Sequence, residues 1–145
     1  MHRRVLCAAC CALTLGSAPA ARAQHAACAP IAASRGAAFA FGSEGGNLRP
    51  GRVEIFADGR VTTDDTSHTP RLTPTVVAQL ARQARTGGFW SLHAPPITRP
   101  PHNPDAARHF VLVRLTCGTR RAEYAGDAPA AFTRLLARLD SVVAR

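Results

Sequence analysis

The fold is decided by the stretch Val53–Glu54–Ile55–Phe56–Ala57–Asp58–Gly59–Arg60–Val61–Thr62–Thr63. Apolar and polar residues alternate on both sides of Asp58–Gly59, which is typical of two half-buried strands. Asp-Gly favours a tight two-residue hairpin turn, because Asp tolerates positive φ and Gly adopts it freely. The stretch therefore predicts a β-hairpin around which the other elements are arranged.

More strands are predicted on both sides of this hairpin. A short first strand is expected over Ala37–Phe41, where two phenylalanines share one face. Alternating apolar residues mark another strand over Arg108–Thr116, the segment 116–119 turns the chain, and 121–124 runs back. This second alternating pair predicts a second hairpin.

Two amphipathic helices are also predicted. The first is expected to begin at Pro74 with Thr73 as its N-cap, and to end at Gly87–Gly88. Asp127 is expected to cap the second helix. Each helix carries an apolar stripe at helical spacing: Val76, Val77, Leu80, Ala81 and Ala84 on the first, and Phe132, Leu135, Leu136, Leu139, Val142 and Val143 on the second.

These elements predict an α+β fold, an antiparallel sheet of about five strands (two hairpins and the first strand) with both helices packed on one face. Residues 37–145 are expected to form this single domain. Residues 24–36 are alanine-rich and have no clear period, so we expect an N-terminal tether held by Cys28.

The first 23 residues have the layout of a secretory signal peptide. Arg3–Arg4 precede the apolar run Val5–Leu15, and a small-residue segment then ends in the Ala-x-Ala pattern at Ala23. The apolar run is too short for a permanent membrane span, and no other segment approaches the necessary length. We expect cleavage after Ala23 and a protein without a transmembrane segment, in the periplasm or the extracellular medium.

Two of the five cysteines, Cys28 and Cys117, lie beyond this leader. An even pair in an exported domain is most simply a disulfide, because the compartment oxidises thiols. Two unrelated free thiols are the alternative.

The charge of the chain comes from 18 arginines, with no lysine, against nine acidic residues. Three of the arginines lie in the leader, which leaves the mature chain at +6. Such a balance is typical of nucleic-acid binding in a cytosolic protein. The export signal argues against nucleic acid here, and a mild attraction to anionic partners remains.

The predicted loops contain no sequence motif of a catalytic, cofactor or metal site. The glycine-rich segment 42–50 is not followed by the Gly-Lys-Ser/Thr of a phosphate-binding loop. The proline-rich segment 93–105 carries histidines, and a metal site using His93, His102, Asp105 and His109 is an alternative whose intervals match no established ligand signature. We expect no enzyme, cofactor or metal, although distant residues can still assemble into a triad.

The order of motifs resembles a group of small secreted bacterial domains. The motifs are Arg52–Val61 with its Asp-Gly turn, Gly87–Gly88–Phe89–Trp90–Ser91–Leu92 after a helix, a loop with Asp105, the strand Val111–Val113 and the helix around Leu135–Leu139. More distantly, the chain is similar to emfourin-type proteins, small inhibitors of thermolysin-like metalloproteases. The resemblance covers residues 37–143. It implies a fold more than a function, and no inhibitory motif of that family is matched residue by residue.

We therefore expect a non-catalytic exported domain that binds a macromolecular partner, with protease inhibition as the most concrete form. Loops on a rigid scaffold carry recognition, so the contacts are expected within 42–50 and 94–105, at Ser43, Glu44, Asn47, Arg49, His102 and Asp105. The alternative is a module for an envelope surface or an anionic ligand that uses Arg82, Arg85, Arg134 and Arg138.

Overall fold

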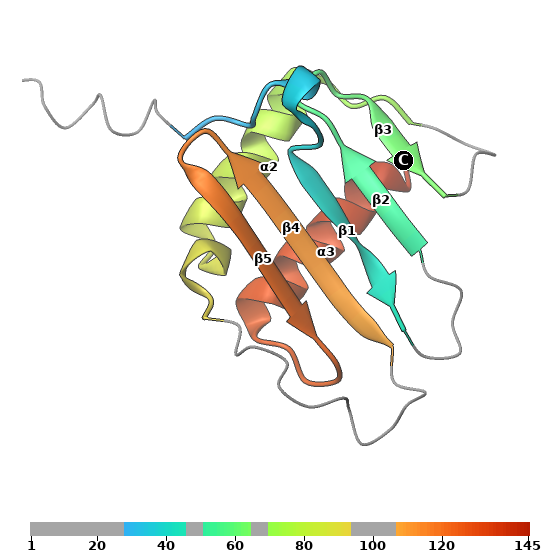
Figure 1. Cartoon of the computed structure of the whole chain (residues 1–145), viewed down its shortest axis with the longest axis vertical. Coiled ribbons are helices and arrows are strands. Elements are labelled where there is room, and N and C mark those ends of the chain that lie inside the picture. Colours follow the sequence, from blue (N-terminus) through green and yellow to red (C-terminus); the bar gives the residue numbers. More distant parts are fainter. Residues whose placement is uncertain (1–27, 46–50, 65–69, 94–106) are drawn as a thin grey trace, which may run out of the picture.

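Five strands form one antiparallel sheet in the order β3-β2-β1-β4-β5 (Figure 1). The computed structural model describes residues 28–45, 51–64, 70–93 and 107–145. Its strands are β1 (Phe39–Glu44), β2 (Gly51–Ile55), β3 (Val61–Thr63), β4 (Arg108–Leu115) and β5 (Gly118–Tyr124). The sheet, together with two helices, confirms the predicted α+β class.

The first strand, β1, lies between the two hairpins and joins them. It pairs with β2 on one side and β4 on the other, so that Phe41 is opposite both Val53 and Val111. Because side chains alternate along a strand, this register places Phe39 and Phe41 on the same face as Ile55 of β2. The apolar faces of both hairpins therefore form one continuous surface.

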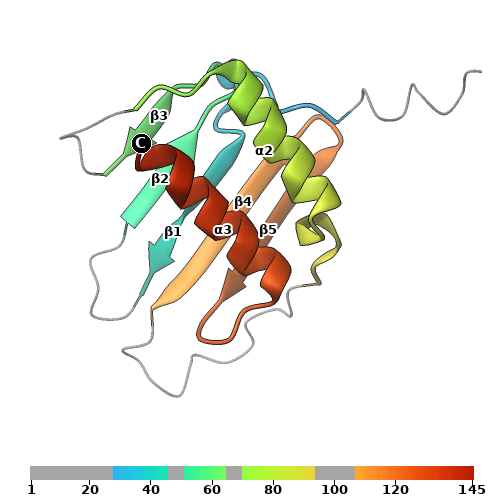
Figure 2. The same ribbon diagram turned by 180° about the vertical axis from the view of Figure 1, so that it is seen from behind.

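Both helices, α2 (Pro74–Thr86) and α3 (Ala130–Val143), cover that surface (Figure 2). The sequence signals at α2 are confirmed: Pro74 is its first residue, and the Thr73 side chain accepts a hydrogen bond from the Val76 N–H at 3.4 Å. The buried helix residues all belong to the two predicted stripes: Val77, Leu80, Ala81 and Ala84 of α2, and Phe132, Leu135, Leu139 and Val142 of α3.

The predicted cap of α3 is wrong. The N-cap residue is Pro129, which offers no side-chain acceptor, and the helix begins at Ala130. Asp127 lies two residues before the cap, which is too early for its carboxylate to reach the N–H groups of the first turn. The backbone carbonyl of Pro129 instead accepts from the N–H groups of Phe132 and Thr133, at 2.9 and 3.1 Å.

The turn of the first hairpin also differs from the prediction. Of its residues only Gly59 has positive φ, at 85°, and Asp58 does not. The Gly59 N–H donates to the Phe56 carbonyl and the Phe56 N–H donates to the Arg60 carbonyl, both at 2.9 Å. This pattern indicates a three-residue loop in which the glycine forms a bulge, the next commonest hairpin connection after the two-residue turn.

The core is built from fully buried aromatic and aliphatic side chains between sheet and helices. Phe132 of α3 packs against Tyr124 of β5 with ring centroids 4.9 Å apart, and against Phe89 of the short 3-10 helix η2 (Phe89–Ser91) at 6.5 Å. Burying one such side chain contributes roughly 1.5–3 kcal/mol, against at most about 1 kcal/mol for an exposed ion pair. The core therefore dominates the stability of the domain.

The segment before β1 is fastened along the end of the β4–β5 hairpin. A disulfide joins Cys28 to Cys117 in the hairpin turn, with their Cα atoms 5.0 Å apart. The Thr116 N–H also donates to the Ala29 carbonyl at 2.8 Å, and the Ile31 N–H to the Arg114 carbonyl at 3.3 Å. The short 3-10 helix η1 (Ala33–Arg35) follows. The described part of the predicted tether is thus held by backbone pairing as well as by Cys28.

A membrane-crossing helix, which would need a long apolar stretch, does not occur in the described part of the chain.

Candidate binding surfaces

The two segments predicted to contact a partner are flanked by neighbouring residues at one end of the sheet. Glu44, the last residue of β1, is paired with Arg108, the first residue of β4. The chain leaves β1 here toward segment 45–50 and enters β4 here from segment 94–106 (Figure 1).

Ser43 and Glu44 belong to β1, although the sequence predicts a loop from residue 42 onward. Gly42 is paired with Arg52 on one side and Phe110 on the other, and Ser43 with Gly51 and His109. Ladder pairing on both sides therefore extends the strand. The other four predicted contact residues, Asn47, Arg49, His102 and Asp105, lie outside the described residues.

A cluster of paired charges lies beside this end, on the sheet face away from the helices. The Arg121 guanidinium contacts Glu44 of β1 and Glu123 of β5, both at 3.1 Å, and Arg108 lies 3.5 Å from Glu123. The guanidinium carbon of Arg121 also lies 4.9 Å from the ring centroid of Phe110. We call Glu44, Arg108, Arg121 and Glu123 the Arg121 cluster.

The Arg121 cluster explains a second, small group of buried apolar residues. Ala40, Phe110 and Leu112 point away from the helices, yet their side chains are buried. Leu112 is paired with Arg121, and Phe110 with Glu123. Long charged side chains bury their apolar stems on such surfaces while the charged ends stay in water. This face of the sheet is therefore covered by its own ion pairs.

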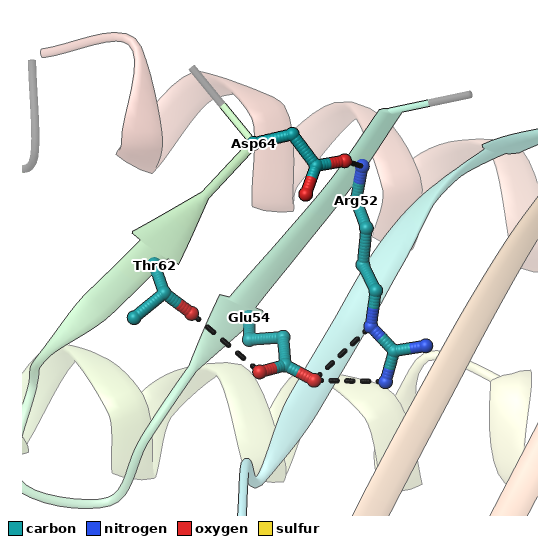
Figure 3. Close-up of polar contacts among 4 residues, drawn as sticks. All are labelled: Arg52, Glu54, Thr62 and Asp64. Atoms are coloured by element: carbon teal, nitrogen blue, oxygen red, sulfur yellow. Dashed lines mark hydrogen bonds and ion pairs between the residues drawn. The ribbon is translucent and has the colours of Figure 1, made fainter. Parts of the chain in front are cut away.

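A second set of polar contacts ties β2 to β3 on the same face (Figure 3). Arg52 donates to Glu54 at 2.8 and 3.1 Å, and the other carboxylate oxygen of Glu54 accepts from the Thr62 hydroxyl at 3.5 Å. The Arg52 N–H donates to Asp64 at 2.8 Å. Asp64 thus ties the end of β3 to the start of β2.

The histidines considered for a metal site are not gathered with further ligands in the described chain. His93 is exposed just after η2, and His109 is exposed on β4. Within the described ranges, no group of three or more His, Cys, Asp and Glu side chains is placed to hold a metal ion. His109 does act on Asp140 of α3: partial burial raises the pKa of the Asp140 carboxyl, and the charge of His109 partly offsets this rise.

The four helix arginines separate into two groups. Arg134 and Arg138 line a groove of about 380 Å³ between the end of α2 and the start of α3, whereas Arg82 and Arg85 do not. The remaining lining residues are Gln83, Thr86, Gly87, Ala131 and Leu135. Sequence reasoning missed these five because they become neighbours only when α2 packs beside α3. The spacing of Arg134 and Arg138, one helical turn apart, was the available signal.

The two groove arginines make few hydrogen bonds to the described residues. One terminal nitrogen of Arg134 donates to the Gly87 carbonyl at 3.4 Å, a long hydrogen bond. The Nε atom of Arg138 is buried, and no described residue accepts its hydrogen bond. Among the described residues, no carboxylate lines the groove. This arrangement contrasts with the Arg121 cluster, where each guanidinium faces a glutamate.

Compared with known proteins, the chain matches no family model, no curated protein and no solved structure. The two surfaces are therefore interpreted from their geometry and chemistry.

Proposed function

We propose that this chain is a non-catalytic exported domain that binds another extracytoplasmic protein, with protease inhibition as the most concrete form. The observation that carries the proposal is the pairing of Glu44 with Arg108. It brings the stems of the two predicted contact segments onto adjacent strands of one rigid sheet. Segments that start from adjacent strands can contact the same partner, and loops held on a rigid scaffold commonly carry recognition.

The stem residues suit protein recognition more than chemistry. Glu44, Arg108, Arg121 and Glu123 neutralise one another, so the end of the sheet presents a polar, nearly balanced rim. Charged rims of this kind steer association and fix the orientation of a partner. The core behind the rim keeps it rigid, which lowers the entropy cost of binding.

Export is part of the same proposal. The leader pattern ending at Ala23 is supported by the Cys28–Cys117 disulfide, because such bonds persist mainly in oxidising compartments. Cleavage after Ala23 would leave the disulfide close to the mature N-terminus. The periplasm or the extracellular medium would be its place of action.

The test uses the oxidised mature chain and a panel of extracytoplasmic proteases that includes a thermolysin-like metalloprotease. We expect saturable inhibition of at least one protease and a complex that co-elutes in size-exclusion chromatography. Neither inhibition nor a complex at concentrations of about 10 μM would remove the inhibitor form of the proposal.

Two matched variants locate the surface. Glu44→Lys and Glu54→Lys reverse the charge of an ion-paired glutamate on the same sheet face. Glu44 lies at the stem of the contact segments, whereas Glu54 lies toward the other end of the sheet, next to the last residue of β2 and opposite Thr62. We expect Glu44→Lys to weaken the complex and Glu54→Lys to leave it unchanged. Equal effects would contradict the assignment of binding to this end.

A second candidate is a module that associates with an anionic envelope surface. The observation that favours it is a charge asymmetry: α2 and α3 carry four arginines and a single acidic residue, Asp140. The arginines of the opposite face are largely paired with glutamates. Retention on anionic lipid or glycan should then fall steeply as salt is raised, and equal retention at low and high salt would reject this candidate.

A further inference from the structure

The groove between α2 and α3 contains one buried guanidinium nitrogen for which no described residue is an acceptor. The Arg138 Nε is shielded from water and lacks an acceptor among the described residues. A buried donor of this kind is costly, and more so when it carries charge. Native proteins satisfy the great majority of such groups, so each exception needs an explanation.

The neighbour of Arg138 increases this cost. Arg134 lies one turn earlier on the same side of α3, and like charges four residues apart repel each other. Asp140, the only acidic residue of α3, does not line the groove. Two positive charges are therefore held together at one concave site, and none of its described lining residues is negative.

The rest of the described lining is uncharged, with small or apolar residues beside the polar side chains of Gln83 and Thr86. Ala131 and Leu135 come from α3, and the backbone of Gly87 lies at the end of α2. Gln83 is exposed on the α2 side and adds an amide that can donate or accept. A volume of about 380 Å³ is within the range of small-molecule sites. The groove thus combines paired cationic donors with an apolar wall.

We propose that this groove binds a small organic anion. A carboxylate or phosphate oxygen of the ligand accepts hydrogen bonds from the guanidinium groups of Arg138 and Arg134, and a short apolar portion packs on Leu135 and Ala131. A guanidinium matches both kinds of oxyanion well, because its donors form a planar fork. The site lies on the helix layer and does not depend on the protein partner proposed above.

The experiment titrates hexyl phosphate and hexanoate into the ¹⁵N-labelled oxidised mature chain. We expect saturable shifts of the backbone amides of Gly87, Ala131, Leu135 and Arg138. Inorganic phosphate should bind more weakly because it lacks the apolar portion. No shifts with either organic probe at about 10 mM would overturn the proposal, and equal affinity for inorganic and hexyl phosphate would overturn the apolar part of it.

Matched variants distinguish binding in the groove from general attraction of anions to a positively charged surface. Arg138→Met keeps a long apolar stem and removes the charge, and Arg134→Gln is a second groove variant. Arg82→Gln removes the same charge from an exposed position of α2 outside the groove. Loss of a charge-assisted hydrogen bond should weaken binding roughly ten-fold or more in both groove variants. Equal weakening by Arg82→Gln would overturn the site.

Vesicles with and without phosphatidylglycerol distinguish a lipid headgroup from a free anion. Binding of hexyl phosphate without Arg138-dependent binding of the anionic vesicles assigns the groove to a free anion. Arg138-dependent binding of both assigns it to a headgroup with the same chemistry. Vesicle binding that Arg82→Gln and Arg138→Met weaken equally reports general surface charge and contradicts the groove as the lipid site. The protease panel measures inhibition and complex formation, and the titrations measure binding of small anions. Failure of this proposal can therefore be distinguished from failure of the proposed protein-binding function.

Discussion

The backbone N–H of Leu72 donates to the carbonyl oxygen of Gly59 at 2.9 Å, which fastens the turn of the first hairpin to the chain entering α2. The two residues are so close that a Cβ atom on Gly59 would lie 1.9 Å from the Leu72 carbonyl oxygen. Gly59 is buried in this contact even though it lies in a turn. The turn therefore joins the sheet to the helix layer.

Gly59→Ala should lower the free energy of unfolding by roughly 2 kcal/mol or more. Positive φ alone costs a non-glycine residue about 1–2 kcal/mol, and the Leu72 backbone would also have to move. Urea denaturation followed by circular dichroism measures the change. The control is Gly51→Ala, since a Cβ there meets nothing within 4 Å. If both variants lose the same stability, the Gly59–Leu72 contact does not have this role.

Removing the disulfide should destabilise the domain by about 3–5 kcal/mol on the loop-entropy account, because it links residues 89 apart. The double variant Cys28→Ser/Cys117→Ser is compared with the wild type in urea, with and without a thiol reductant. The reductant should lower the midpoint of the wild type and leave that of the variant unchanged. If the urea midpoint of the wild type does not change when the disulfide is completely reduced, the bond does not stabilise the domain.

Removing the predicted cap residue should lower the stability of the protein at the start of α2 but not at the start of α3. Thr73→Ala removes the side-chain acceptor of the Val76 N–H and should cost about 1 kcal/mol. Asp127→Ala should change stability by less than about 0.5 kcal/mol, because Asp127 is exposed and lies outside α3. Thermal and urea unfolding of both variants check the difference. If Asp127→Ala loses more stability than Thr73→Ala, Asp127 does act as a cap of α3.

Asp140 should make stability depend on pH in the acidic range. Partial burial raises the pKa of its carboxyl in the folded state, so the folded protein holds this proton more tightly than the unfolded chain does. The resulting stability is present below the ordinary aspartate pKa and is lost as pH rises through the raised one.

Asp140→Asn should therefore be slightly more stable than the wild type at neutral pH, by up to about 0.5 kcal/mol. The difference should shrink below about pH 4. Urea midpoints measured across this range test the sign, with Asp127→Asn as a control for loss of one negative charge. A difference that grows on acidification would contradict the prediction.

The local elements could be predicted because each signal depends on neighbouring residues. Thr73 and Pro74 mark the start of α2 through a cap and a preset φ, and both act within one turn. The alternation around Val53–Ile55 and Val111–Val113 identifies strands, since side-chain direction reverses at every residue. The stripes of both helices were predictable for the same reason, with a period of 3.6.

Two of the misses have their cause in distant contacts. Asp58-Gly59 suggested a two-residue turn, but Gly59 is also held by Leu72, thirteen residues later. The wrong cap at Asp127 is instead a local error of two residues, since Pro129 is the N-cap residue. Ser43 and Glu44 looked like loop residues because the sequence does not reveal their strand partners. Ser43 is paired with both β2 and β4, and Glu44 is paired with β4.

The sequence by itself determined the elements, their apolar faces and the pair of cysteines available for a disulfide, because periodicity and capping are local properties. Only the tertiary structure decided that β1 joins the two hairpins, that Glu44 meets Arg108, and that Arg134 and Arg138 share a groove with the end of α2. The physical reason is that an apolar face must be buried but does not specify its partner. That choice depends on how all the faces fit together, and residues far apart in the chain become one surface only then.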